Sequence, residues 1–300
     1  MNFKNKVFTI VFAMGTSLSV YANTQMVKID GSSTVYPIIE AVAEEFSKVN
    51  PKIRVTAGVS GTGGGFKKFI AGEIDICDAS RPVKDSEKAE LTKKGIKYHE
   101  VKVGYDGLSV IINPANTFVD YLSTEELAKI WAPGSKVKTW ADIRSTWPKK
   151  EIKLYGPGTD SGTFDFFTEV INGKSQVSRS DFTKSEDDNV LVKGVAGDKF
   201  ALAYLGHAYV EENKDSLKVV PIGPSKEKAI TPTTETIKNN TYAPLSRPLF
   251  IYVADKSLKK PEVKSFIEFM LKNSSKLVSE VGYVPLTDME YQTETKVLAR

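Results

Sequence analysis

Residues 155–167 read YGPGTDSGTFDFF, and this stretch carries the pattern that decides the predicted fold. A β-like segment runs through two glycines and a proline into Ser161, and Phe164 and Phe167 then follow at helical spacing. Serine is common at helix starts because its hydroxyl accepts a hydrogen bond from an otherwise unpaired N–H group of the first turn. The stretch therefore predicts a strand, a short polar loop and a helix that begins directly after Ser161.

Two further loops nearer the N-terminus repeat this order of strand, polar loop and helix. The three loops read DGSST at residues 30–34, SGTGGG at 60–65 and TDSGT at 159–163. At a helix start, unpaired N–H groups and the helix dipole favour negative charge, hydroxyl groups add donors, and glycine lets the backbone approach a ligand closely. One such loop alone is typical of an ordinary helix cap, but three in one chain predict a binding site for a small anion.

The rest of the chain alternates β-branched segments with amphipathic ones. Helices are predicted to begin at Pro37, Ser123 and Pro261, and strands are predicted at residues 27–30, 53–57, 74–77, 104–113 and 249–253. This alternation is typical of an α/β fold in which a parallel sheet is covered on both faces. The polar residues 223–247 are predicted to form a surface excursion.

The two longest predicted strands indicate a division into two lobes. The chain is expected to cross to a second lobe near residues 104–110 and to return near 245–253. Lobe 1 would then comprise residues 23–106 and 250–300, and lobe 2 would comprise residues 107–249. Two such crossings form a hinge, and ligands bind in the cleft between lobes.

The first 22 residues have the pattern of a cleaved secretory signal peptide. Lys4 and Lys6 precede an apolar run at residues 7–14, and small residues before position 23 suit cleavage. Export is therefore expected, and no later segment has the ~20 consecutive apolar residues of a membrane-spanning helix.

The charge balance of the chain is close to neutral. Of the 300 residues, 41 are Lys or Arg and 37 are Asp or Glu. Loss of residues 1–22 removes Lys4 and Lys6 and no acidic residue, which leaves 39 basic and 37 acidic side chains. Proteins that bind nucleic acid usually show a clustered basic patch, so no nucleic-acid partner is expected.

The chain has one cysteine, Cys77, and two histidines, His99 and His207. These are too few for a zinc or iron site with the usual ligands, so no metal and no cofactor is expected, and Cys77 is predicted to be a buried apolar residue. The Asp-Ser-Gly sequence at Ser161 raises the alternative of a serine hydrolase, which would need a base such as histidine. Both histidines lie in segments typical of structural elements, so a binding protein is favoured over an enzyme.

Five short segments follow one another in a specific order along the chain. They read GSSTVYP at residues 31–37, SGTGGG at 60–65, ASRP at 79–82, DSGT at 160–163 and GYVPL at 282–286. In this combination the chain resembles the periplasmic phosphate-binding proteins of high-affinity ABC transporters. The resemblance implies a two-lobed type II periplasmic binding fold that closes on one inorganic phosphate and docks on a membrane permease. A periplasmic monomer that does not insert into the membrane is expected.

The resemblance also implies which residues bind phosphate, namely Ser33, Thr34, Thr62, Gly63, Ser161, Gly162 and Thr163. The chain departs from the family at two places. Many members have an aspartate in the loop after the third strand, where this chain has Arg81, and an arginine four residues before the second-lobe serine, where this chain has Pro157. We therefore predict that Arg81 supplies the guanidinium contact, since its planar fork can bind two oxygens.

The residue that accepts the proton of phosphate is left open by the sequence. A buried carboxylate would favour phosphate over sulfate, because sulfate has no proton to donate. The candidates are Asp160, Asp106 and Asp78, and Arg247 is a further residue that either faces the cleft or holds the hinge. The alternatives to phosphate binding are a binder of another oxyanion, such as sulfate, molybdate or phosphonate, and an exported phosphate-ester hydrolase.

Overall fold

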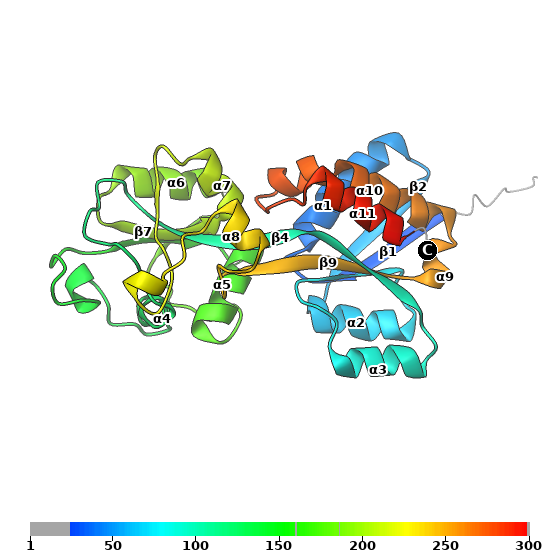
Figure 1. Ribbon diagram of the computed structural model, residues 1–300, viewed down its shortest axis with the longest axis horizontal. Coiled ribbons are helices and arrows are strands. Elements are labelled where there is room, and N and C mark those ends of the chain that lie inside the picture. The colour runs from blue at the N-terminus through cyan, green and yellow to red at the C-terminus, as the bar shows by residue number, and fades with distance from the viewer. Residues whose placement is uncertain (1–24, 160, 186, 299–300) are drawn as a thin grey trace, which may run out of the picture.

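The computed structural model describes residues 25–159, 161–185 and 187–298. The predicted signal peptide, residues 1–22, and Asp160 lie outside the described residues. Figure 1 shows two bodies of mixed helices and strands, joined by the long strands β4 (Tyr98–Ile112) and β9 (Ser246–Ala254). Within the described ranges, no helix is long and apolar enough to cross a membrane.

The first body contains a mixed half of the sheet. The strands β1 (Gln25–Gly31), β2 (Ile53–Val59) and β3 (Ile76–Ala79) are parallel, and β9 runs antiparallel beside β3. β4 pairs antiparallel with β9, from Tyr98 opposite Ala254 to Gly107 opposite Ser246. The parallel arrangement predicted from the first three strands is therefore correct for β1–β3. The two long strands are antiparallel to each other, because the chain leaves this body on β4 and returns in the opposite direction on β9.

The same sheet continues into the second body through β4. There β4 pairs antiparallel with β7 (Ala201–Gly206) and β8 (Lys218–Val219), and β5 (Lys153–Pro157) lies parallel to both β7 and β6 (Thr183–Ser185). The strand order is β2-β1-β3-β9-β4-β7-β5-β6. The two bodies are thus connected by a single hydrogen-bonded sheet.

Helices cover both faces of the first half of the sheet, with α1, α10 and α11 on one side and α2 and α3 on the other (Figure 1). On α1 the predicted apolar face is buried, and Phe46 packs edge-to-face on Phe266 of α10 with 5.4 Å between ring centroids. The helices of this body are α1 (Tyr36–Val49), α2 (Gly61–Ala71), α3 (Asp85–Lys93), α9 (Asp255–Leu258), α10 (Pro261–Glu280) and α11 (Asp288–Val297).

In the second body, aromatic packing fixes the position of α5. Phe167 of this helix stacks on Tyr204 of β7 with 3.7 Å between ring centroids, and Trp131 of α4 contacts both rings edge-on. The predicted cap of α4 is present, since the Ser123 hydroxyl accepts from the N–H of Glu126 at 3.2 Å. The helices here are α4 (Thr124–Trp131), α5 (Gly162–Asn172), α6 (Asp188–Gly197), α7 (His207–Glu212) and α8 (Thr234–Lys238), with 3₁₀ turns at Trp140–Asp142 and Lys226–Lys228.

Two local predictions need correction. The third strand begins at Ile76 instead of residue 74, because the Asp75 side chain accepts hydrogen bonds from the N–H of Lys28 at 3.1 Å and from Nζ of Lys260 at 2.8 Å. Residues 223–247 are more than a surface excursion. They include α8, whose Ile237 is fully buried against Gly107 of β4.

Two helical regions contain more helix than the sequence analysis predicted. The glycine-rich residues 61–65 form the first turns of α2 instead of a loop before it. The C-terminal helix extends to Glu280 and is followed by α11, which the sequence did not predict because its hydrophobic periodicity is weak. Cys77 is fully buried, as predicted.

Candidate functional site

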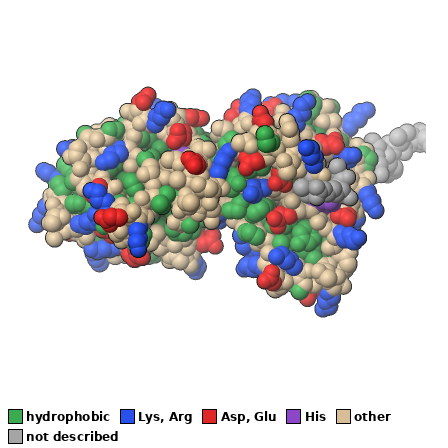
Figure 2. Space-filling model, in the orientation of Figure 1, with side chains coloured by type: hydrophobic (Ala, Val, Ile, Leu, Met, Phe, Trp, Pro, Cys, Tyr) green, Lys and Arg blue, Asp and Glu red, His purple; other side chains and the backbone are tan. Residues whose placement is uncertain are grey.

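Segments from both bodies meet at a cleft of about 370 Å³. Figure 2 shows that charged side chains of both signs are interspersed over the face seen there. The cleft lies where the loop after β1, the start of α2, the loop after β3, the side of α5 and the start of β9 come together. Its lining residues are Ser32, Ser33, Thr34, Gly61, Thr62, Gly63, Ser80, Arg81, Lys84, Asp165, Glu169, Ser175 and Arg247.

The first loop turns sharply after β1 ends at Gly31. The N–H of Ser32 donates to the carbonyl of Asp78 at 3.1 Å, and the N–H of Thr34 donates to the Ser32 hydroxyl at 3.2 Å. A side chain at Gly31 would overlap the carbonyl and carboxyl oxygens of Asp78, so glycine is required for this close approach. After this turn, Ser33 and Thr34 both line the cleft.

The second loop is followed by α2, and the start of this helix faces the cleft. The hydroxyl of Ser60, which precedes the helix, donates to the carboxylate of Asp30 instead of capping the helix, and Nζ of Lys68 also binds Asp30 at 2.6 Å. The first N–H groups of α2 therefore have no side-chain cap, and such groups attract anions. Thr62 and Gly63 line the cleft, where Oγ1 of Thr62 accepts from the N–H of Ser80 at 3.2 Å.

Arg81 lines the cleft from the loop after β3 and already has a carboxylate partner. Its guanidinium donates from Nη1 and Nη2 to the two oxygens of Glu87, at 2.9 and 2.7 Å. Glu87 lies in the first turn of α3, where it also accepts from the N–H of Lys84 at 2.8 Å. Such a bidentate pair fixes the orientation of the guanidinium plane. Nη1 also donates to the carbonyl of Pro82 at 3.0 Å, so the N–H groups left for a ligand are those of Nε and Nη2.

Arg247 connects most parts of the site. Its Nη2 donates to the Thr34 hydroxyl at 2.8 Å and its Nε to Oδ2 of Asp106 at 3.2 Å, while its Nη1 lies 3.8 Å from the carboxylate of Glu169. The guanidinium also lies over the ring of Phe166, at 3.6 Å from the centroid. The sequence left open whether Arg247 faces the cleft or holds the hinge strands, and the structure places it in both positions.

The start of α5 lies against the first loop. Ser161 caps the helix as predicted, since its hydroxyl accepts from the N–H of Thr163 at 3.2 Å. A side-chain carbon at Gly162 would lie 2.9 Å from Cα of Thr34 and 3.2 Å from the hydroxyl of Tyr283. The structure thus brings the second-lobe loop beside the first loop, although Ser161, Gly162 and Thr163 do not themselves line the cleft.

The three carboxylates proposed from the sequence lie in different places. Asp106 is fully buried under Arg247, and burial raises its pKa to about 6 although Arg247 opposes the shift. Asp78 is packed beneath Gly31 and does not line the cleft, and burial raises its pKa to about 8. Asp160 lies outside the described residues. Neither Asp78 nor Asp106 is therefore placed to face a ligand in the cleft.

A different carboxylate, that of Asp165, does line the cleft and was missed by the sequence reasoning. Its Oδ2 accepts a hydrogen bond from the Ser33 hydroxyl at 3.0 Å, which joins α5 to the first loop. The available signal was its position four residues after the helix cap Ser161, which places both residues on the same side of α5.

Neither histidine is placed to activate Ser161. Nδ1 of His207 lies 2.9 Å from the hydroxyl of Ser109, and Nε2 of His99 lies 3.0 Å from the carboxylate of Asp255. The described contacts of Ser161 are those of a helix cap.

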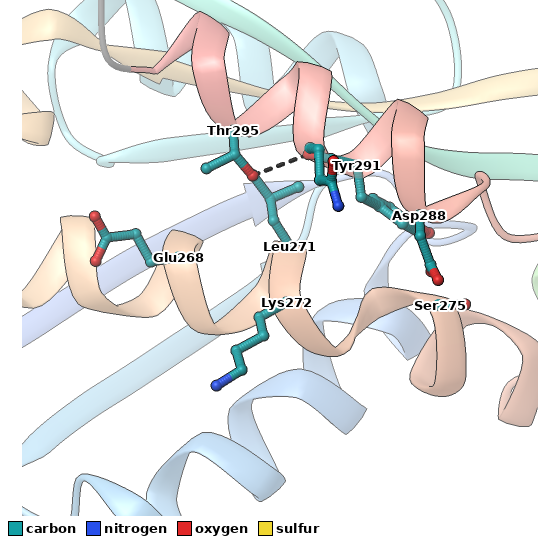
Figure 3. Close-up of a pocket in the computed structure, with 8 residues that line it drawn as sticks. Glu268, Leu271, Lys272, Ser275, Asp288, Tyr291 and Thr295 are labelled. Carbon is teal, nitrogen blue, oxygen red and sulfur yellow. Dashed lines mark hydrogen bonds between the residues drawn. The ribbon is translucent and has the colours of Figure 1, made fainter.

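A second hollow of about 440 Å³ lies between α10 and α11, on the outside of the first body (Figure 3). It is lined by Glu268, Leu271, Lys272, Ser275, Asp288, Tyr291, Gln292 and Thr295. Two carboxylates and one ammonium give it an unfavourable charge for anions, and none of the three predicted loops contributes to it. The cleft at Arg247 is therefore the candidate functional site.

Comparison with known proteins gives consistent results. The family model described as a PBP superfamily domain matches residues 19–274. The chain is 49% identical to "Protein SphX" of Synechococcus elongatus, over 92% of this chain and 82% of that protein. It is 44% identical to "Phosphate-binding protein PstS" of Staphylococcus haemolyticus, over 91% of this chain and 85% of that protein.

Among solved structures, a possible phosphate binding protein from Planctomyces limnophilus matches with a TM-score of 0.87 and 50% identity, over 92% of this chain and 98% of that chain. An ABC-type phosphate transport receptor from Vibrio cholerae matches with a TM-score of 0.64 and 23% identity, over 87% of this chain and all of that chain, which shows a shared fold.

Proposed function

The chain belongs to the PBP superfamily, and on this premise we propose that it binds inorganic phosphate and delivers it to an ABC-type phosphate importer. Its fold is the type II periplasmic binding fold predicted from the sequence. Relatives that match most of the chain are named for phosphate binding, and the family is one of transport binding proteins, not of enzymes.

One observation carries the proposal. Two guanidinium groups, from Arg81 and Arg247, lie in the same cleft as the hydroxyls of Ser33 and Thr34 and the uncapped start of α2. Tetrahedral phosphate has four oxygens that accept hydrogen bonds from several directions, and arginine forks, hydroxyls and helix N–H groups all donate to such oxygens. This combination binds a small oxyanion without a metal.

The mechanism is binding without a chemical step. We propose that residues 23–106 with 250–300 and residues 107–249 act as two lobes that close about β4 and β9. Phosphate would bridge the first-lobe loops and the start of α5, where Gly162 lies beside Thr34. Closure removes the anion from water and strengthens its charge-assisted hydrogen bonds, so micromolar or tighter affinity, about −8 kcal/mol or better, is expected.

The cellular setting follows from the same proposal. We propose that residues 1–22 direct export, that the mature protein works in the periplasm as a monomer, and that its phosphate-bound shape is recognised by a membrane permease. No catalytic step is part of this function.

Calorimetric titration of the purified protein with a panel of oxyanions tests the proposal. Phosphate should give a saturable heat at several pH values, while sulfate, molybdate and phosphonate should give little. A preference for sulfate or molybdate would keep the fold assignment and change the ligand. Turnover of an aryl phosphate that is lost on mutation of the cleft would instead support an exported phosphate-ester hydrolase.

Arg81→Ala is expected to weaken phosphate binding by roughly a hundredfold, or about 2.7 kcal/mol, because it removes a guanidinium from the cleft. Calorimetry would measure the dissociation constant. Arg144→Ala is a matched control, since Arg144 forms a similar pair with Glu126, at 2.7 and 2.9 Å, away from the cleft. If both variants keep wild-type affinity, Arg81 is not a ligand.

Gly162→Ala is expected to weaken phosphate binding by roughly tenfold, or about 1.4 kcal/mol. The added methyl group would lie 2.9 Å from Cα of Thr34, so it should force α5 away from the first loop. Gly197→Ala serves as the control because the space around Gly197 is empty within 4 Å. Equal affinities for both variants would mean that the two loops do not close on the ligand at this contact.

A further inference from the structure

The two bodies also touch outside the cleft, at a contact made by two glycines and a tyrosine. Gly282 follows α10 of the first body, whereas Gly206 ends β7 and Tyr209 lies on α7 of the second body. A side-chain carbon at Gly282 would lie 2.4 Å from Cε2 of Tyr209, so the aromatic ring occupies the space that a side chain would fill. A side-chain carbon at Gly206 would lie 2.8 Å from the carbonyl oxygen of Gly282. The two bodies are therefore in direct contact at this place.

Both surfaces of this contact are attached to β4, the strand on which the chain leaves the first body. Val284, which follows Gly282 closely in the chain, exchanges hydrogen bonds of 2.8 and 2.9 Å with Tyr105. Gly206 pairs with Leu108 where β4 lies beside β7. Rotation of the backbone between residues 105 and 108 therefore moves one surface of the contact relative to the other.

The contact lies on the opposite side of the sheet from the cleft. The cleft is lined by the start of α2 and the loop after β3, and α2 covers one face of the sheet. Gly282 follows α10, which covers the other face, and Figure 1 shows α7 on that same side of β4 and β9. A hinge motion that closes one side of the sheet opens the other side. Closure of the cleft should therefore separate Tyr209 from Gly282.

The structure has the features expected of the open form. The cleft of about 370 Å³ is far larger than one phosphate ion, and Ser161, Gly162 and Thr163 do not line it. In this form the ring of Tyr209 packs on the buried Gly282, and burial of aromatic surface is favourable. The contact therefore stabilises the open form relative to a form in which the lobes have closed.

We propose that Tyr209 is a positioning residue, which holds the lobes apart in the absence of ligand by packing on Gly282. This inference rests on the proposed function, in which the lobes close on phosphate. The measured affinity of a protein that closes on its ligand is the affinity of the closed form reduced by the cost of closure. Because closure separates Tyr209 from Gly282, this contact lowers the affinity for phosphate without touching the ligand.

Tyr209→Ala tests the proposal in the full-length mature protein. It removes the ring from the contact, so we expect the affinity for phosphate, measured by calorimetric titration, to rise by roughly tenfold. Tyr209→Phe is the matched control, because it keeps the ring carbons that pack on Gly282, and its affinity should stay within about threefold of wild type. A residue that only supports the fold would not give a gain in affinity that phenylalanine reverses.

Gly206→Ala tests the same contact by adding atoms instead of removing them. Gly206 has a φ of −58°, which alanine adopts without strain, and the new methyl group would meet the carbonyl oxygen of Gly282 in the open form. Separation of the lobes on this side relieves the overlap, so the closed form is favoured. The affinity for phosphate should therefore rise again, by roughly threefold or more.

Small-angle X-ray scattering of the ligand-free proteins gives a second readout that does not depend on the titration. The radius of gyration of Tyr209→Ala and of Gly206→Ala should be smaller than that of ligand-free wild type. It should lie closer to the value of wild type saturated with phosphate. Tyr209→Phe should scatter as ligand-free wild type does.

The outcomes separate this proposal from the function on which it depends. Phosphate binding by wild type, with unchanged or lower affinity in a folded Tyr209→Ala or Gly206→Ala variant, would overturn the role of Tyr209 and leave the function intact. If Tyr209→Ala does not fold, the result for Gly206→Ala decides. Failure of wild type to bind phosphate would overturn the proposed function and this proposal with it.

Discussion

Arg247→Ala is expected to lower phosphate affinity by roughly a thousandfold, or about 4 kcal/mol. Arg247 donates to Thr34 of the first loop and to Asp106 of β4, and its guanidinium lies over Phe166 of α5. The substitution thus removes a cation from the cleft. It also removes the contacts that hold the first loop, β4 and α5 together. Isothermal titration with phosphate measures the affinity, and retention within tenfold of wild type would exclude Arg247 from the site.

The same substitution should also lower the free energy of unfolding by about 3 kcal/mol, because it leaves Asp106 fully buried without its partner. The double variant Arg247→Ala with Asp106→Asn separates the two effects. It removes the uncompensated buried charge, so urea denaturation should show that most of the lost stability returns, while phosphate affinity stays low. Recovery of affinity in the double variant would mean that Arg247 serves only to stabilise the hinge strands.

Arg247 also shows what could be predicted from the sequence and what could not. The three loops were recognisable because helix caps, glycines and hydroxyls act locally, and the cap at Ser161 is as predicted. The partners of Arg247 are set by tertiary structure, since Thr34 lies 213 residues away along the chain. No local pattern reports such a contact, so the sequence left its position open between cleft and hinge.

The aspartates likewise show that local sequence patterns do not tell which side chains line the cleft. From the sequence, Asp78 and Asp106 were candidates because they flank predicted loops and crossings, yet the structure buries both away from the cleft. Asp165 was overlooked because its partner Ser33 is 132 residues distant and belongs to the other body. Which side chains line the cleft depends on how β4 and β9 place α5 against the first loop, and the assignment of ligands to these residues stays a prediction.

Asp78→Asn is expected to change how the stability of the protein depends on pH. Burial raises the pKa of Asp78 from its usual value of 3.8 to about 8, and the nearby carboxylate of Asp30 adds to the shift. Its Oδ1 is buried and has no hydrogen-bond partner within the described part of the chain. In the folded protein this carboxyl therefore stays protonated at neutral pH, whereas in the unfolded chain it ionises near pH 4.

The sign of the effect follows from proton linkage. Between roughly pH 4 and pH 8 the folded state binds more protons than the unfolded state at this position, so the free energy of unfolding of the wild type falls as pH rises. Asparagine does not ionise, so residue 78 of the variant causes no such fall in the free energy of unfolding as pH rises. The stability of Asp78→Asn relative to wild type should accordingly rise by about 3–5 kcal/mol across that window.

Urea denaturation of both proteins at pH values through this window measures the difference. The raised pKa of Asp106 and the lowered pKa of His207 add pH dependence to both proteins alike, so their contributions cancel when the two curves are subtracted. Parallel curves would show that the Asp78 carboxyl is ionised in the folded state. A negative charge would then lie directly beneath Gly31 and the first anion-binding loop, where it would oppose the binding of phosphate.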